Sequence, residues 1–166
     1  MKYTLKFLLI LLIFSSCSKS KENLFWISEN NGQNNDFLFM AESTNVKTIT
    51  DSLSHYLTIK EIVQADKVTY KNFGEIYKNT EFKVNIILRI GSKSGRDYKF
   101  IVRTFKNNGG IIDSYELAEW NEQDSKYCFG SINKGLIINR NCGKTKDVKQ
   151  ISTDGRIIAT SYHGRE

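Results

Sequence analysis

The chain contains no proline, only three cysteines and only two histidines among its 166 residues. The absence of proline, together with many Asn, Lys and Ile residues, is typical of an AT-rich genome and excludes no class of function. So few cysteines and histidines leave little material for a zinc-type cluster, and we expect no metal and no cofactor. The sequence also lacks a Walker loop, GxGxxG, HExxH and CxxC, which excludes the sites that those motifs mark.

The apolar run at the N-terminus is too short to span a bilayer. Residues 8–14, LLILLIF, fall well below the roughly 20 apolar residues that a membrane-spanning helix needs. Lys2 and Lys6 precede the run, and Ser15 and Ser16 follow it. A positive start, a short apolar core and a small-residue site predict a secretory signal peptide. A buried core helix is the alternative, but the run has no amphipathic pattern.

The residues after this run are similar to a known processing site. Phe14-Ser15-Ser16-Cys17 resembles the bacterial lipobox, with Phe14 where Leu is commoner. The resemblance covers residues 1–17 and implies cleavage before Cys17, followed by acylation (palmitate-type chains) of its thiol and its new amino group. Two or more acyl chains give stable membrane anchoring, which one chain does not. The alternative is ordinary secretion, with Cys17 left as a plain thiol.

These signals divide the chain into three parts. Residues 1–16 are predicted as the signal peptide, 17–23 as the lipidated cysteine with a polar tether, and 24–166 as a single mainly-β domain. The tether carries no run of acidic residues, which favours an outer-membrane anchor that faces the periplasm. Removing residues 1–16 lowers the net charge from +6 to +4. Because the basic residues are scattered and no recognition module is visible, we expect no nucleic-acid partner.

The domain has the pattern of an antiparallel sheet with one helix. Apolar residues alternate through 82–90 and 98–105, and Asn107-Asn108-Gly109-Gly110 is a strong hairpin signal. Residues 24–28 and 37–42 suggest two more short strands, and an apolar face predicts a helix around 48–57. The predicted fold class is α+β, mostly β: an antiparallel meander of about six strands with a short helix packed on one face.

With Cys17 assigned to lipid, two cysteines remain for a disulfide. Cys128 and Cys142 flank a predicted strand–turn–strand unit, which would bring them together across a hairpin. An exported protein can keep such a bond in an oxidising compartment. A slip of one residue in register would place the two side chains on opposite faces, so the prediction depends on register.

The sequence contains few candidate catalytic groups. His55 lies in the predicted helix and His163 lies close to the C-terminus, and both are interpreted as solvated or partly packed. In the strand around residues 111–120, strict alternation places Asp113 and Glu119 on one face and Glu116 on the other. That spacing favours a solvated strand over the carboxylate pair of a glycosidase.

Four basic residues cluster in sequence around a predicted loop at residues 91–95. They form a candidate basic rim, but solvated outer positions that discourage edge pairing are the favoured interpretation. The residues are Arg89, Arg96, Lys99 and Arg103.

The C-terminal half is similar to small uncharacterised lipoproteins of Bacteroidota-like bacteria. The similarity covers roughly residues 80–158 and is carried by RTFKNNGGIIDSYELAEW, YCFGSI and ISTDGRII. It implies a sheet-rich periplasmic or outer-membrane domain and no known activity. The leading hypothesis is a membrane-anchored module that binds an envelope protein or a small ligand. An envelope hydrolase with an unrecognised site and an inhibitor or immunity-type lipoprotein are the alternatives.

Overall fold

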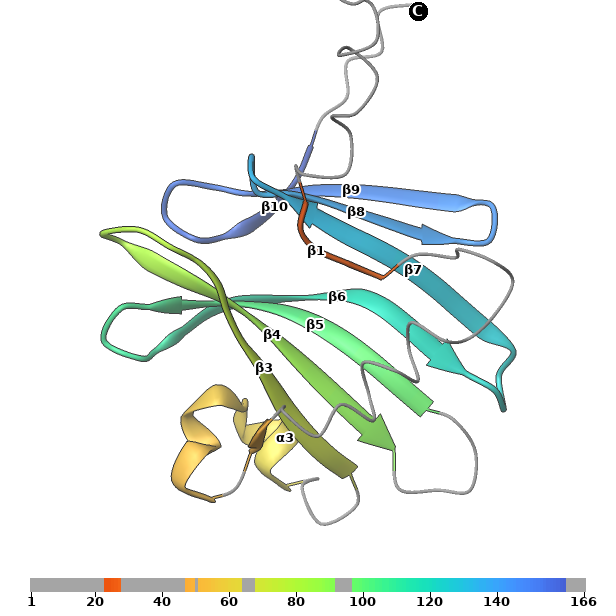
Figure 1. Cartoon of the computed structure of the whole chain (residues 1–166), viewed down its shortest axis with the longest axis horizontal. Helices are drawn as coiled ribbons and strands as arrows, with labels where there is room; N and C mark the ends of the chain where they lie inside the picture. Colours follow the sequence, from red (N-terminus) through yellow and green to blue (C-terminus); the bar gives the residue numbers. More distant parts are fainter. Residues whose placement is uncertain (1–22, 28–46, 50, 64–67, 92–96, 161–166) are drawn as a thin grey trace, which may run out of the picture.

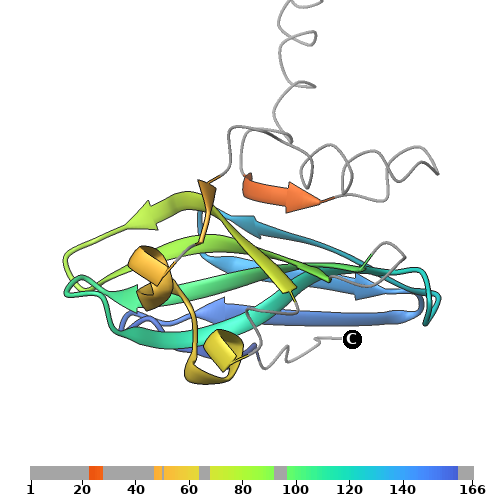
Figure 2. The same cartoon turned by 90° about the horizontal axis from the view of Figure 1, so that it is seen from below.

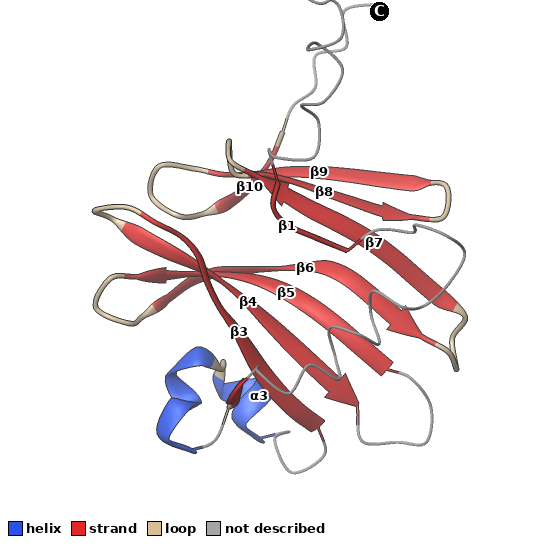
Figure 3. Cartoon of the chain, in the orientation of Figure 1, coloured by secondary structure: helices blue, strands red, loops and turns tan. Residues whose placement is uncertain are grey.

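The computed structural model describes residues 23–27, 47–49, 51–63, 68–91 and 97–160 (Figure 1). The predicted strand at 37–42, together with Cys17, Arg96 and His163, lies outside these residues. Strands dominate, as Figure 3 shows. The elements are β1 (Asn23–Ile27), β2 (Lys47–Thr48), η2 (Asp51–Tyr56), α3 (Ile59–Val63), β3 (Val68–Lys78), β4 (Phe82–Gly91), β5 (Asp97–Lys106), β6 (Ile111–Asn121), β7 (Lys126–Asn133), β8 (Ile137–Cys142), β9 (Thr145–Ile151) and β10 (Ile157–Ala159).

The described strands form one antiparallel sheet, and the predicted meander is confirmed. β2 to β10 follow one another as hydrogen-bonded neighbours in chain order, and β1 pairs with β7 beside this series. The prediction of about six strands is wrong, because the continuous series alone has nine. The sequence pattern did not predict β3, because two irregularities in its pairing with β4 interrupt the alternation of side chains between the two faces of the strand.

The sheet divides into two parts at β6 and β7. These two strands pair over only three residue pairs, from Glu119–Cys128 to Asn121–Lys126. Beyond that point β7 pairs with β1 on the same side, and Figure 1 shows β7 to β10 spreading away from β3 to β6. The ring of Phe25 on β1 lies 5.8 Å from that of Phe100 on β5. β1 therefore contributes to the core that joins the two parts.

The main core is built from the alternating residues that the sequence predicted. Phe82, Val84, Ile86 and Leu88 of β4 are buried together with Phe100. The tight turn between β5 and β6 depends on Gly109, which has a φ of 103° that non-glycine residues rarely adopt. The alternation thus predicts the central strands correctly because one face of each strand packs into this core.

The helical segment covers the opposite face of β4 and β5. Leu57 packs there against Tyr70 and Ile87, with Ile101 beside them. The predicted helix at 48–57 is instead the 3-10 helix η2 followed by the five-residue helix α3. Figure 2 shows β1 and the helices on opposite sides of the sheet. We call the side that carries η2 and α3 the helical face.

Candidate functional site

A β-bulge in β6 brings two carboxylates to the same face of the sheet. Phe100 pairs with Ala118 but Ile101 pairs with Glu116, so Leu117 is an extra residue in the strand. The extra residue places Glu116 and Glu119 on the same side, and the prediction that they face apart is wrong. Asp113 does not join them: its carboxylate accepts a hydrogen bond of 2.8 Å from the backbone N–H of Ile157.

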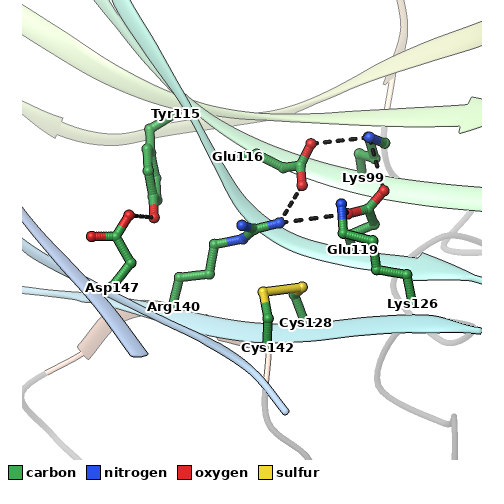
Figure 4. Close-up of a disulfide and its surroundings, with 9 residues drawn as sticks. All are labelled: Lys99, Tyr115, Glu116, Glu119, Lys126, Cys128, Arg140, Cys142 and Asp147. Carbon is green, nitrogen blue, oxygen red and sulfur yellow. Dashed lines mark hydrogen bonds and ion pairs between the residues drawn. A yellow bond between two sulfur atoms is a disulfide. The ribbon is translucent and has the colours of Figure 1, made fainter. Parts of the chain in front are cut away.

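Glu119 is the centre of a charged network that joins β5, β6, β7 and β8 (Figure 4). Its side chain is 3% exposed, and its carboxylate lies 2.8 Å from the Lys99 ammonium and 2.5 Å from that of Lys126. Arg140 forms ion pairs with both Glu116 and Glu119, and Lys99 also reaches Glu116 at 3.0 Å. Two carboxylates are thus shared among three cations, which satisfies the buried charge of Glu119.

The network fixes the protonation state of Glu119. Burial alone would raise its pKa, but hydrogen bonds from Lys126 and Lys99 outweigh this effect and hold the pKa at about 2. The carboxyl group is therefore ionised at neutral pH and has no proton to donate. A glycosidase needs one of its paired carboxyl groups as a general acid with a raised pKa, a role that the ionised Glu119 does not fill.

We expect the stability of the domain to depend on Glu119 at acidic pH. Because its folded pKa is depressed from the ordinary 4.5, its contribution is complete above about pH 4.5 and falls as the pH approaches 2. Urea unfolding of wild type and Glu119→Gln at several pH values should show the difference between them shrink by on the order of 2 kcal/mol across this window, after allowance for screening. A difference that does not change with pH would contradict this assignment.

A second charged link ties α3 to the sheet. Arg103 of β5 is 2% exposed, and its guanidinium lies 2.7 Å from the Glu61 carboxylate. The same group donates hydrogen bonds to the Tyr56 carbonyl at 2.5 Å and to the Ser114 hydroxyl at 2.9 Å. The prediction that Arg103 is a solvated outer position is wrong, because η2 and α3 cover its side chain.

Thr58 and Glu61 form a capping box at the start of α3. The Glu61 carboxylate accepts a hydrogen bond of 2.7 Å from the Thr58 N–H, and the Thr58 hydroxyl accepts one of 3.3 Å from the Glu61 N–H. Burial opposes ionisation of Glu61, but the Arg103 guanidinium and the Thr58 hydrogen bonds outweigh it and lower its pKa. Sequence reasoning missed this residue, although the T-x-x-E spacing in Thr58-Ile59-Lys60-Glu61 is a recognisable signal.

An open pocket of about 590 Å³ lies between these two links on the helical face. Among the described residues that line it, none has an aliphatic side chain and Tyr70 is the one aromatic residue; its pKa is raised by burial and by the Glu61 charge. Most of its charged groups are already paired within the protein, such as Arg89 with Asp97 at 2.8 Å. The lining residues are Thr58, Lys60, Glu61, Tyr70, Arg89, Asp97, Lys99, Glu119, Asn121, Asp124 and Lys126.

The predicted disulfide is confirmed and lies beside the charged network. Cys128 and Cys142 are direct partners in the β7–β8 register, with Cα atoms 4.3 Å apart, and Figure 4 shows the bond next to Arg140. On β8 Arg140 is two residues from Cys142, so both side chains lie on one face. The disulfide therefore holds together the two strands that supply Lys126 and Arg140.

A further hydrogen bond connects β6 to β9 near the same network. The Tyr115 hydroxyl donates to the Asp147 carboxylate at 2.7 Å. Burial and this acceptor raise the pKa of Tyr115, and the same bond lowers the pKa of Asp147. The pair joins the two parts of the sheet.

The remaining candidates that the structure describes do not come together as a catalytic group. His55 is exposed on η2, with its ring centroid 4.2 Å from that of Tyr56. Of the proposed basic rim, Arg89 and Lys99 are each paired with carboxylates and line the pocket, whereas Arg103 is buried. Among the described residues, no three His, Cys, Asp or Glu side chains are placed to hold a metal ion.

Comparisons with protein-family models, with curated proteins and with solved structures each gave no match. Within the described part of the chain, no helix has the length and apolar character needed to cross a bilayer.

Proposed function

We propose that this protein is a lipid-anchored binding module of the bacterial envelope, acylated at Cys17 and attached to the outer membrane on its periplasmic side. Its binding surface is the pocket on the helical face. The observation that carries the binding role is this pocket, whose walls are fixed by the Glu61–Arg103 pair and by the Glu119 network. The lipobox-like segment before Cys17 supports the anchor.

The pairing of the pocket charges supports binding over catalysis. Glu119, with a pKa of about 2, is held as a charge and not as a proton donor. Lys99 and Lys126 neutralise it at 2.8 and 2.5 Å. Preorganised polar groups of this kind fix the orientation of a ligand without changing its covalent bonds.

Replacement of Cys17 tests the anchor. We expect Cys17→Ala to lower the membrane-bound fraction at least about tenfold. Acylation needs the Cys17 thiol, and a protein without its acyl chains is not held stably at the membrane. Fractionation of cells followed by immunoblotting measures this, with the domain's thermal unfolding as the control for folding. Unchanged retention in the membrane would refute the anchor and leave the binding role open.

Obstruction of the pocket tests the binding role. Asp124 lines the pocket, whereas its exposed neighbour Gln123 does not. With the domain immobilised and exposed to solubilised envelope fractions, we expect Asp124→Trp to weaken retention of the bound component at least about tenfold because the indole occupies the pocket. Gln123→Trp should retain it as wild type does. No retained component, or equal retention by both variants, would count against a binding role for the pocket.

A further inference from the structure

Helix α3 is amphipathic in the reverse sense to an ordinary surface helix. Its aliphatic residues Ile59, Ile62 and Val63 are 83%, 46% and 74% exposed. Its acidic residue Glu61 points inward, where it meets the buried Arg103. A helix on a soluble protein normally buries its apolar stripe and exposes its charges. Here the fold presents a contiguous aliphatic surface, at positions i, i+3 and i+4, to its surroundings.

This exposure is built into the fold. Five residues are too few for a stable isolated helix, yet α3 is fixed at its start by the Thr58–Glu61 capping box. Arg103 then holds Glu61 at 2.7 Å and also binds the carbonyl of Tyr56 in the preceding η2. The sheet thus holds the helix in an orientation that keeps its aliphatic side outward.

The position of α3 argues against the bilayer as the group that covers it. If Cys17 is the anchor, five residues separate it from the start of β1 at Asn23, and an extended chain over these six steps reaches roughly 20 Å. β1 lies on the side of the sheet opposite to α3 (Figure 2). The β1 layer and the β3–β6 layer, which are roughly 10 Å apart, therefore stand between the anchored bilayer and the helix.

Charge argues against a second copy of the chain. In a two-fold dimer α3 would meet α3 and bring the two Lys60 ammonium groups together. Lys60 is exposed between the aliphatic residues and the pocket, and it makes no ion pair within the described residues.

We propose that α3 docks into an apolar groove of another envelope protein, one that carries a carboxylate beside the groove to pair with Lys60. Ile59, Ile62 and Val63 fill the groove, and the polar pocket next to α3 lies at the rim of the same interface. An apolar centre with a polar rim is the usual anatomy of a protein–protein interface. The inference rests on the proposed binding role and names the class of partner.

Photo-crosslinking of the full-length chain in its own cells tests this proposal. The probe is p-benzoylphenylalanine, placed in turn at position 62, at Asp124 in the pocket and at the exposed Ile158 of β10. We expect a discrete protein adduct from position 62 and none from position 158. The adduct should fall at least about tenfold with Ile59→Asp combined with Val63→Asp, and also with Lys60→Glu. Lys134→Glu, at an exposed turn, is the matched charge control and should change nothing.

The crosslinked peptide decides what covers α3. An apolar segment with a neighbouring Asp or Glu in a different protein supports the proposal. A crosslink to lipid, to a second copy or to the same chain overturns it. A protein adduct whose yield is the same in the Ile59, Val63 and Lys60 variants as in wild type overturns it too. An adduct from position 124 but none from 62 refutes the α3 interface and leaves the binding role intact. No adduct from either position refutes both. Because the altered side chains are exposed, unchanged urea unfolding confirms that the variants fold.

Discussion

Arg103→Met is expected to lower the free energy of unfolding by about 3–4 kcal/mol, the largest loss from any single substitution considered for this protein. Arg103 is almost completely buried and contacts Glu61, Tyr56 and Ser114 at 2.5–2.9 Å. Methionine fills much of the same volume but leaves the Glu61 carboxylate without its cation and the Tyr56 carbonyl without a donor. Urea denaturation followed by circular dichroism measures the loss.

Arg89→Met is the matched control for this prediction. Arg89 pairs with Asp97 at the same kind of distance, 2.8 Å, but the two side chains are 24% and 29% exposed. Solvent screens such a pair, so the expected loss is below about 1 kcal/mol. Adding Glu61→Gln to Arg103→Met should recover part of the stability by removing the uncompensated charge. Equal losses for Arg103→Met and Arg89→Met would contradict the central place given to Arg103.

Replacing both Cys128 and Cys142 with serine is expected to cost about 3 kcal/mol of stability. The bond closes a loop with a sequence separation of 14, and opening a loop of this size returns entropy to the unfolded chain. The loss also frees β8 to move relative to β7, which loosens the contacts of Arg140 with Glu116 and Glu119.

Thermal and urea unfolding with and without a reductant measure the effect of the disulfide. The reduced wild type should resemble the double serine variant, and a reductant should not change that variant. Cys17→Ala supplies the control, because it removes a cysteine outside the bond and should leave domain stability unchanged. A wild type that resists unfolding equally in its reduced form would show that the bond contributes little.

The parts of the fold that follow from local pattern were predictable from the sequence. β4 carries an apolar residue at every second position from Phe82 to Leu88 because that face meets the core, and Ile87 is apolar on the other face because it meets the helical segment. The Cys128–Cys142 pairing was predictable for a related reason, since a short turn sets the register of the hairpin that the two residues close. In strands that pair without a bulge, the apolar pattern of the sequence therefore predicts correctly which residues face the core.

The candidate site could not be predicted because it depends on departures from regular pairing and on distant contacts. The bulge at Leu117 shifts Glu119 to the face of Glu116, and nothing in the residue types marks that extra residue. The Glu61–Arg103 pair joins residues 42 positions apart, which no local pattern specifies. In the sequence, Arg103 therefore cannot be distinguished from the other basic residues of its strand. Its burial follows only from the tertiary position of η2 and α3.

The pairing of β1 has a mechanical consequence. Every other pairing among the described strands joins successive strands, whereas β1 pairs with a strand more than a hundred residues further along the chain. We expect such a long-range contact to close after the local hairpins have formed, because closing a longer loop costs more entropy. β1 also directly follows the proposed tether, so a force pulling the domain from the membrane acts on Asn23 first. Under load the protein would release β1 while the remaining ladder from β2 to β10 stays paired.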